Sequence, residues 1–409
     1  MALTRARQFG IKAEASEGTA ESITAAECAV NAENTEYTLK IGNYERKFDR
    51  ASFTPQKMLP GPASLSIKTV IECVGGTAST QAPWHHALRA SGFARTAVVS
   101  QTIDDTIGGT APVVGTLIGN NASQGSATKV ARLVHIVTTS GAKKIWYSMV
   151  TGVAFVASDT IYGYDGGSGV IDPTAVSAAA GHLFTPTTET ESAATESATV
   201  QERIGGEVIT AVGARGTCKF MIKHGEPLKF ETEMTGLPVL EDDGGGLLQF
   251  PQAAPISGVA SPGTPARVAK GLAPFLMDAY SPVATTFDID MGNTVTLRPT
   301  IGTGTGTVTD CGYLPPRITD RKIVATFDPE QPALATFNFT KKMVNVVTHL
   351  FHFMIGNIGD TVGCLKIIGP AVQLTGDATA GDRDGIVIRN LTALFTGSQD
   401  DELFLAHIF

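Results

Sequence analysis

The hydrophobic positions of this chain mostly alternate with polar ones, which is the two-residue period of β-strands. The clearest early examples are residues 37–41 and 64–74, and between them a proline-rich run at residues 48–62 predicts a long loop, because proline does not fit a sheet interior. Further strands are predicted at residues 208–212, 216–223, 228–235, 286–290, 294–297, 322–327, 363–369 and 371–374. The pattern predicts a mainly β protein.

The last stretch, residues 381–409, combines a strand pattern with strong turn chemistry. A Gly/Asp turn leads into a strand with alternating Ile386 and Ile388, and an acidic turn at Asp400, Asp401 and Glu402 leads into a terminal strand. Neighbouring carboxylates can serve in catalysis, but in turns beside strands they are typical of solvated turn residues. The pattern predicts a chain end held in a sheet.

One short helix interrupts the strands. Pro83 stands in its first turn, Trp84 begins its apolar face, and Gly92 stands where the helix should end. The adjacent His85 and His86 would point about 100° apart on this helix, which is poor geometry for holding one metal ion. We expect the helix to lie against the sheet.

Between residues 101 and 182, clusters of Gly and Asn bracket short strands predicted at residues 129–138, 144–150 and 160–164. Short strands at regular spacing predict a small all-β domain inserted into the parent sheet. Its aromatic side chains pack in its interior or line a sugar-binding face; they are Trp146, Tyr147, Tyr162 and Tyr164.

Three segments set the remaining boundaries. Residues 1–35 are rich in Ala, Glu, Ser and Thr and predict an N-terminal arm, either free or docked on the body. Residues 185–199 are a polar return from the insert, and residues 241–275 are a Gly/Pro-rich linker. The predicted domains are therefore the arm (1–35), a discontinuous first domain (36–100 and 183–240), the insert (101–182), the linker (241–275) and a second domain (276–409).

The two parent domains share an order of features that indicates an internal duplication. Each opens with a Gly-Asn pair and passes through a proline-rich stretch to a strand flanked by lysine. A proline-led segment follows, at Pro83 and at Pro332, and each domain closes on a hairpin, at residues 216–237 and 372–397. The match lies in pattern and not in residue identity.

The charge balance argues against one class of function. The 409 residues carry 31 Lys and Arg against 39 Asp and Glu, a net charge of −8, and no basic run stands out. A surface that grips DNA needs such a cluster, because neutralised phosphates supply most of the non-specific affinity. We expect no tight binding to nucleic acid.

Other chemistry is sparse. The sequence has no nucleophile elbow, phosphate loop or metal-ligand spacing, so we expect no enzyme activity, no catalytic residue, no cofactor and no metal. The cysteines are widely separated and form no CxxC pair, which predicts buried free thiols in a cytosolic product; they are Cys28, Cys73, Cys218, Cys311 and Cys364. Neither a signal peptide nor a membrane span is predicted.

Several motifs together resemble the tail tube proteins, or major tail proteins, of long-tailed bacteriophages. They are Phe9-Gly10-Ile11 with Glu14 and Gly18-Thr19, the helical segment 82–93, residues 213–217 with 225–227, and the turns at 382–385 and 400–403. Their order and spacing extend over most of the chain apart from the insert.

The resemblance implies that each parent domain is a β-sandwich or barrel with a short helix, and that neighbouring sheets close around a DNA channel. Two such domains per chain imply trimeric rings with pseudo-sixfold symmetry, whereas one domain implies hexamers. The rings would stack into the tail of a virion made in bacterial cytoplasm. Its partners would be the tape measure, tail terminator and distal tail proteins, with dsDNA passing through without specific binding.

Two further expectations rest on the insert, which has a composition of its own and carries Tyr and Trp side chains. Excising about residues 102–180 should leave tube formation intact, and the alternative function is a virion receptor- or sugar-binding fibre or a capsid decoration protein. Candidates for ring stacking and subunit contact are Phe48, Asp49, Arg50, Phe53, Arg317, Asp320, Arg321, Asp400, Asp401 and Glu402. An acidic lumen would let DNA pass without trapping it, and the lumen-facing candidates are Glu231, Glu233, Asp288 and Asp290.

Overall fold

The protein is mainly β in this computed structural model, as the alternating pattern predicts. The structure describes residues 7–29, 31–44, 59–104, 111–137, 143–164, 170–190, 195–244, 248–259, 275–278, 280–300, 312–356, 358, 363–398 and 400–409. Its strands and two α-helices are, in chain order, β1 (Arg7–Ala13), β2 (Cys28–Ala29), β3 (Ala32–Tyr44), β4 (Leu59–Glu72), α1 (Pro83–Ala90), β5 (Phe93–Thr102), β6 (Leu117–Gly119), β7 (Val130–Val137), β8 (Lys144–Thr151), β9 (Ile161–Gly163), β10 (Val170–Ile171), β11 (Ala178–Pro186), β12 (Ala198–Ile204), β13 (Glu207–Lys223), β14 (Lys229–Pro238), β15 (Glu241–Asp242), β16 (Leu248–Gln249), β17 (Leu276–Met277), β18 (Thr286–Asp290), β19 (Asn293–Pro299), β20 (Tyr313–Arg321), β21 (Val324–Phe327), α2 (Phe339–Val344), β22 (Thr348–Ile355), β23 (Cys364–Arg383), β24 (Ile386–Thr396) and β25 (Phe404–Ile408).

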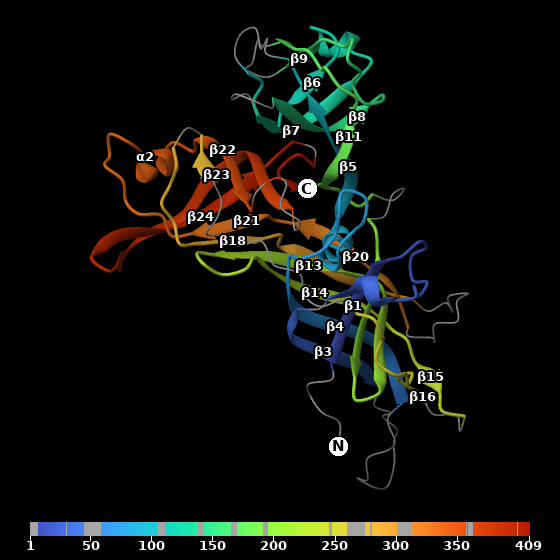
Figure 1. The fold of residues 1–409 in the computed structure, drawn as a ribbon. Helices are drawn as coiled ribbons and strands as arrows, with labels where there is room; N and C mark the ends of the chain where they lie inside the picture. The colour runs from blue at the N-terminus through green and yellow to red at the C-terminus, as the bar shows by residue number, and fades with distance from the viewer. Residues whose placement is uncertain are drawn as a thin grey trace.

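A row of eight antiparallel strands runs through the molecule. Its order is β3, β4, β14, β13, β18, β21, β24 and β23. In Figure 1 the green β13 and β14 lie between the blue β3 and β4 and the orange β18 and β21. The row therefore passes from one predicted parent domain into the other without interruption.

The first four strands of this row and the last four are paired in the same way. In the first set, β4 lies between β3 and β14, and β14 forms a hairpin with β13. In the second set, β21 lies between β18 and β24, and β24 forms a hairpin with β23. Phe327 faces Leu391 in the second set as Ile71 faces Phe230 in the first. The two sets meet where β13 pairs with β18.

One large hydrophobic core joins both sets, because alternate residues of their strands face the same side. Helix α1 forms as the sequence predicts, and its Trp84 is 1% exposed and packs against the rings of Phe220 and Phe230. Helix α2 begins at Phe339, which is buried in the same core. An aromatic core of this size favours a single well-packed body.

The N-terminal segment takes the docked form of the two that the sequence allows. Strand β1 pairs along its whole length with β12, from Arg7 opposite Ile204 to Ala13 opposite Ala198. Phe9 is 2% exposed in the core. Residues 7–13 are thus part of the sheet.

The insert forms a small β unit on the stem made by β5 and β11, at the top of Figure 1. Its own core gathers buried side chains such as Ile118, Leu133 and Tyr147. A second apolar cluster ties it to the C-terminal part of the chain, because Val134 and Trp146 pack with Phe404 and Ile368. The terminal strand β25 pairs with both β11 and β23, so the chain end is held in the sheet as predicted.

One boundary prediction is wrong in part, and the predicted linker also contacts the sheet. Residues 59–62 of the predicted proline-rich loop belong to β4, where Pro60 faces Asn43 of β3. Proline is tolerated there because this end of β4 pairs with β3 alone among the described strands, so the missing N–H lies at an edge. Part of the predicted linker is docked, since the carbonyl of Pro251 accepts from the Val208 N–H at 2.7 Å.

Candidate functional site

The joint between the two sets is a short antiparallel ladder. It pairs five residues of β13 with five of β18, from Lys219 opposite Asp290 to Lys223 opposite Thr286. Phe220 and Ile289 are fully buried on its core side. On the other side the Lys219 ammonium lies 2.9 Å from the Asp288 carboxylate. The joint therefore combines backbone pairing, apolar packing and an ion pair.

The four candidate lumen residues lie on one face of the strand row. Glu231 and Glu233 alternate with the buried Phe230, Thr232 and Met234 of β14. Asp288 and Asp290 alternate in the same way with the buried residues of β18. We call the side opposite the core the open face.

The open face is less acidic than the sequence predicts. The Lys68 ammonium lies 2.6 Å from Glu231, and hydrogen bonding to this carboxylate raises the pKa of Lys68. The Lys219 ammonium forms an ion pair with Asp288. Two of the four candidate carboxylates are thus neutralised by lysines of neighbouring strands. In the second set, Thr392 of β24 holds the position that Glu231 holds in β14, and Thr326 of β21 lies opposite Thr392; both are uncharged.

A buried ionic network fastens the β19–β20 hairpin of the second set onto the first set. Arg215 of β13 has no exposed side-chain surface, and its guanidinium lies 2.8 Å from both Glu17 and Glu189. Arg317 of β20 reaches the same two carboxylates at 3.1 and 3.3 Å. Arg215 also donates to the carbonyl of Pro316 at 2.8 Å. Arg317, which the sequence predicts to contact another subunit, therefore forms ion pairs within its own chain.

Glu14 organises the N-terminal motif beside this network. One of its carboxylate oxygens accepts from the Gly213 N–H at 2.8 Å, and the other accepts from the Gly18 N–H at 2.8 Å. Gly213 has a φ of 60°, and a Cβ on it would meet Pro315 at 2.7 Å, so only glycine fits. The motif residues at 14–18 and 213–215, far apart in sequence, therefore meet at one point.

The acidic C-terminal turn forms ion pairs with Arg321. The guanidinium lies 3.0 Å from Asp400 and 2.8 Å from Glu402. These residues line a groove of about 730 Å³, whose other walls include Thr188 and Phe395. Three predicted contact residues, Arg321, Asp400 and Glu402, are thus brought together within one chain.

Other predicted residues lie outside this cluster. The carboxylate of Asp320 accepts from the Arg321 N–H, and that of Asp401 accepts from the Ser398 N–H at 2.7 Å. Phe48, Asp49, Arg50 and Phe53 lie outside the described residues.

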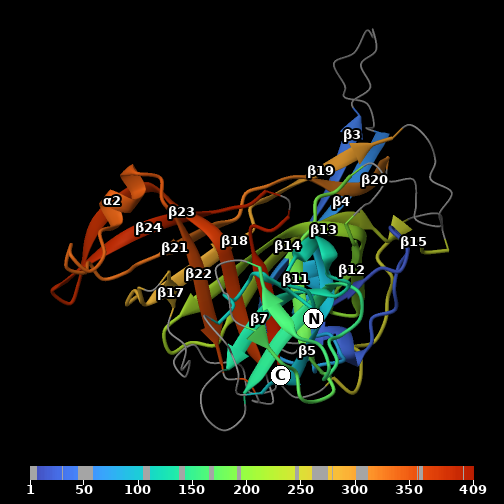
Figure 2. The same ribbon diagram turned by 90° about the horizontal axis from the view of Figure 1, so that it is seen from above.

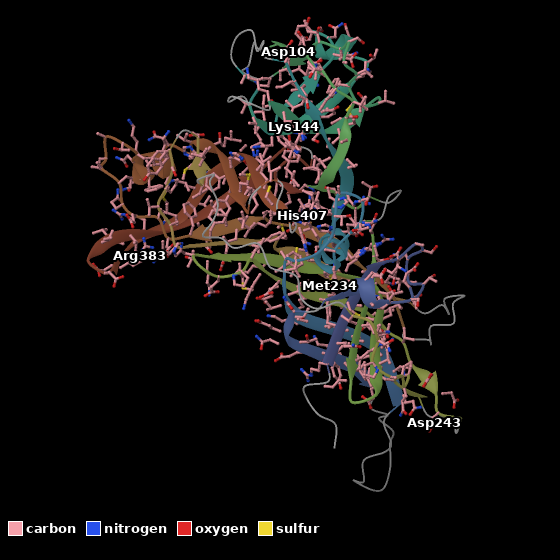
Figure 3. The ribbon with its side chains drawn as sticks, in the orientation of Figure 1. Asp104, Lys144, Met234, Asp243, Arg383 and His407 are labelled. Carbon is pink, nitrogen blue, oxygen red and sulfur yellow. The ribbon has the colours of Figure 1, made fainter. Side chains whose placement is uncertain are left out.

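A histidine cluster, which the sequence did not predict, lies where α1, the insert stem and the terminal strand meet. The His85 Nδ1 accepts from the Ala82 N–H at 3.1 Å, so its Nε2 carries the proton and donates to the His407 Nδ1 at 2.9 Å. His182 packs against His85 with ring centroids 5.1 Å apart. Figure 3 labels His407 at this junction. All three side chains are buried.

This cluster predicts that the protein loses stability in mild acid. Burial holds the pKa of His85 well below its usual range and lowers those of His182 and His86, the last to about 4. A histidine with a lowered pKa is neutral when folded but takes up a proton when unfolded, so its contribution to stability is lost as pH falls below about 6.5. The free energy of unfolding should therefore fall between about pH 7 and pH 5.

Denaturant titrations at several pH values measure this fall. The variant H85Q should show a smaller fall than the native chain, and H224N, which alters an exposed histidine, should show the same fall. A pH dependence unchanged in H85Q would contradict the assignment.

A buried lysine lies between the insert and the body. The Lys366 ammonium is 2.8 Å from the His135 Nδ1, and burial lowers the pKa of Lys366 to about 7. Of the insert aromatics, Trp146 and Tyr147 are buried in apolar clusters, so they cannot line a sugar-binding face. Because the insert shares the cluster around Phe404 with β25, excising residues 102–180 would uncover apolar side chains of the body.

Within the described ranges, no group of three or more His, Cys, Asp or Glu side chains is placed to hold a metal ion. No helix of the described chain is long and apolar enough to cross a membrane. Four of the five cysteines are buried free thiols as predicted, and Cys311 lies outside the described residues. Neither a protein-family model nor a curated protein matches the chain.

Proposed function

We propose that this chain is a structural virion protein that polymerises as stacked rings into the tail tube of a long-tailed bacteriophage. The observation that carries the proposal is the joint between β13 and β18, because it is an edge-to-edge contact between two similar four-strand sets. A contact that joins two similar units within one chain can be repeated between chains. Repetition of a heterologous contact produces rings or filaments.

The row ends in two strand edges suited to this repetition. Beyond Thr375, β23 pairs with β24 on one side and has no ladder partner on the other among the described residues. At the other end of the row, β3 pairs only with β4 in the described part of the chain. These edges hold the positions that β13 and β18 hold at the internal joint. Unpaired edges are liabilities unless another strand covers them.

Three copies joined in this way would close a ring of six similar sets, which is the pseudo-sixfold ring that the resemblance to tail tube proteins implies. The open faces would then line a continuous channel. Its lysine-paired carboxylates and uncharged threonines would give passing DNA few phosphate contacts. The tape measure, tail terminator and distal tail proteins remain the proposed partners at the ends of the tube.

Negative-stain microscopy of the purified protein tests this function. We expect hollow tubes with an axial repeat, at one or more salt concentrations. Particles that stay monomeric or compact under all salt conditions would contradict the proposal.

A further inference from the structure

The second set holds onto the first set through more than the strand joint. The β19–β20 hairpin, which continues β18 and precedes β21, lies across the C-terminal end of α1. Asn293 donates to the carbonyl of Ser91 at 2.7 Å and to that of Gly216 at 2.9 Å. A Cβ placed on Gly92 would meet Ile318 at 3.2 Å. The hairpin therefore covers the end of the helix and the adjacent stretch of β13.

The hairpin also covers the end of the β13–β14 pair. Tyr313 packs against the cluster of Val212 and Leu237. The carbonyl of Pro316 accepts from the buried Arg215 of β13. The docking site in the first set is thus formed by the helix end, the middle of β13 and the end of β14.

The second set has the same three features. Helix α2 packs on β23 as α1 packs on β13. Each helix is followed by a residue with positive φ, Val346 at 53° after α2 and Gly92 at 83° after α1. Strand β24 ends at Thr396, which Gly397 follows, and β14 has Thr235-Gly236 near its end; both threonines directly follow a core residue, Phe395 or Met234.

In the second set these features are uncovered. Val344 and Val346 at the end of α2 are 75% and 60% exposed. Ala371 of β23 and Thr396 of β24, which match Arg215 and Thr235 of the first set, line a groove of about 290 Å³. Exposed apolar side chains at the end of α2, which packs on β23, together with a groove along β23, indicate a surface for a partner.

The segment that matches the β19–β20 hairpin is the outer stem of β3 and β4. Pro60 stands as far before Ile71 in β4 as Pro316 stands before Phe327 in the second set. The stem lies at the bottom of Figure 1 and at the edge of Figure 2, where β19 and β20 of the same chain run beside it. Its Ile41 is 50% exposed and Tyr37 is 40% exposed. It therefore offers apolar side chains of its own.

We propose that the β3–β4 stem of one chain docks on the α2 end and β23–β24 groove of a second copy of this chain. The occupant is a second copy because β3 and β23 lie at opposite ends of the strand row, so the stem cannot reach the groove of its own chain. The contact within the chain supplies the template for the contact between chains. This inference rests on the proposed assembly and names the segment that holds neighbouring subunits in a ring.

Charged substitutions on both sides of this contact test the inference. The variant I41E and the double variant V344E/V346E should each raise the critical concentration for tube assembly by about tenfold or more, measured by sedimentation. The control V153E/V176E places the same charges on equally exposed valines of the insert and should assemble as the native chain does. If the native chain forms tubes and both test variants assemble normally, the docking is wrong while the tube function stands. If the native chain forms no tubes, the function itself fails.

A cross-linking experiment gives an answer that does not depend on lost assembly. Pro62 stands as far before Ile71 as Ile318 stands before Phe327, and Ile318 lies beside Gly92. Pro62 should therefore lie near Val346 of the neighbouring copy. In assembled P62C/V346C, a short bis-maleimide should link chains into covalent oligomers, whereas the single variants P62C and V346C should give none above background. Equal yields in all three variants would overturn the docking.

Discussion

The variant A380P should fold normally and fail to assemble. Ala380 lies on the unpaired side of β23, opposite Arg389 of β24. The two-residue turn at Asp384 and Gly385 has φ values of 53° and 83°, which is a type I′ turn, so the backbone groups of alternate residues before it point away from β24. Proline at position 380 would remove a donor from the edge and leave the β23–β24 hairpin intact.

The backbone partners support this assignment. The Arg389 N–H donates to the carbonyl of Pro329 at 2.8 Å, so the pair of Ala380 and Arg389 is not joined by ladder hydrogen bonds. In the first set Ile222 holds the matching place and pairs with Phe287 of β18, and two residues further on the His224 N–H donates to the Thr285 carbonyl at 2.9 Å, so alternate N–H groups here point toward β18. Ala380 is therefore placed to donate across the proposed joint.

The expected loss of assembly free energy follows from the missing N–H donor and the unpaired backbone acceptor that it leaves at each joint between chains. It amounts to about 1–3 kcal/mol, or roughly 10- to 100-fold in the critical concentration for assembly. Sedimentation measures the assembled fraction, and circular dichroism checks the fold. The control A380V keeps the N–H and should assemble. Normal assembly of A380P would show that this edge of β23 makes no strand pairing between chains.

The variant R215M should lose more stability than any surface substitution in the chain. Arg215 is completely buried, and removing its guanidinium leaves Glu189, which is 7% exposed, and the carbonyl of Pro316 without this donor. Removing one partner of a buried ion pair costs about 3–5 kcal/mol. The hairpin that joins the second set to the first should loosen as a result.

Chemical denaturation measures the change in the free energy of unfolding. The control K229M breaks the exposed pair with Glu33 and should cost less than about 1 kcal/mol. If the free energy of unfolding of R215M lies within about 1 kcal/mol of that of the native chain, the network around Arg215 does not hold the two sets together.

The local elements were predictable because their signals are local. Helix α1 shows a proline in its first turn and glycine after its end, and both features appear in the structure. The strands of the row follow from strict alternation, as in β14, where Glu231 and Glu233 point away from Phe230 and Met234.

The long-range contacts were not predictable from these signals. Arg215 and Lys366 are charged residues with no exposed side-chain surface, and single-sequence patterns assign such residues to the surface. Arg215 is buried because Glu17 and Glu189 come to it from distant segments. The pairing of β25 with β11 likewise joins residues far apart in sequence, which alternation alone does not specify.

The proline-rich stretch shows why the start of β4 was missed. Pro60 argues against a strand in a sheet interior, but the end of β4 is an edge, and the sequence does not say which strands lie at edges. The Gly/Pro-rich segment that reads as a linker is docked in part through hydrogen bonds such as that between Gln8 and Ile256. Composition shows that this segment has few side chains able to form a core, but it does not say whether the backbone of the segment forms hydrogen bonds with the sheet.

A symmetry count on single rings seen end-on tests the central claim most directly, because the strand row of one chain should continue into the next. Two-dimensional class averages should show three copies of the chain around a hollow centre, with six similar inner lobes and three insert-sized projections. Rings of six chains, or particles without a central channel, would contradict the account.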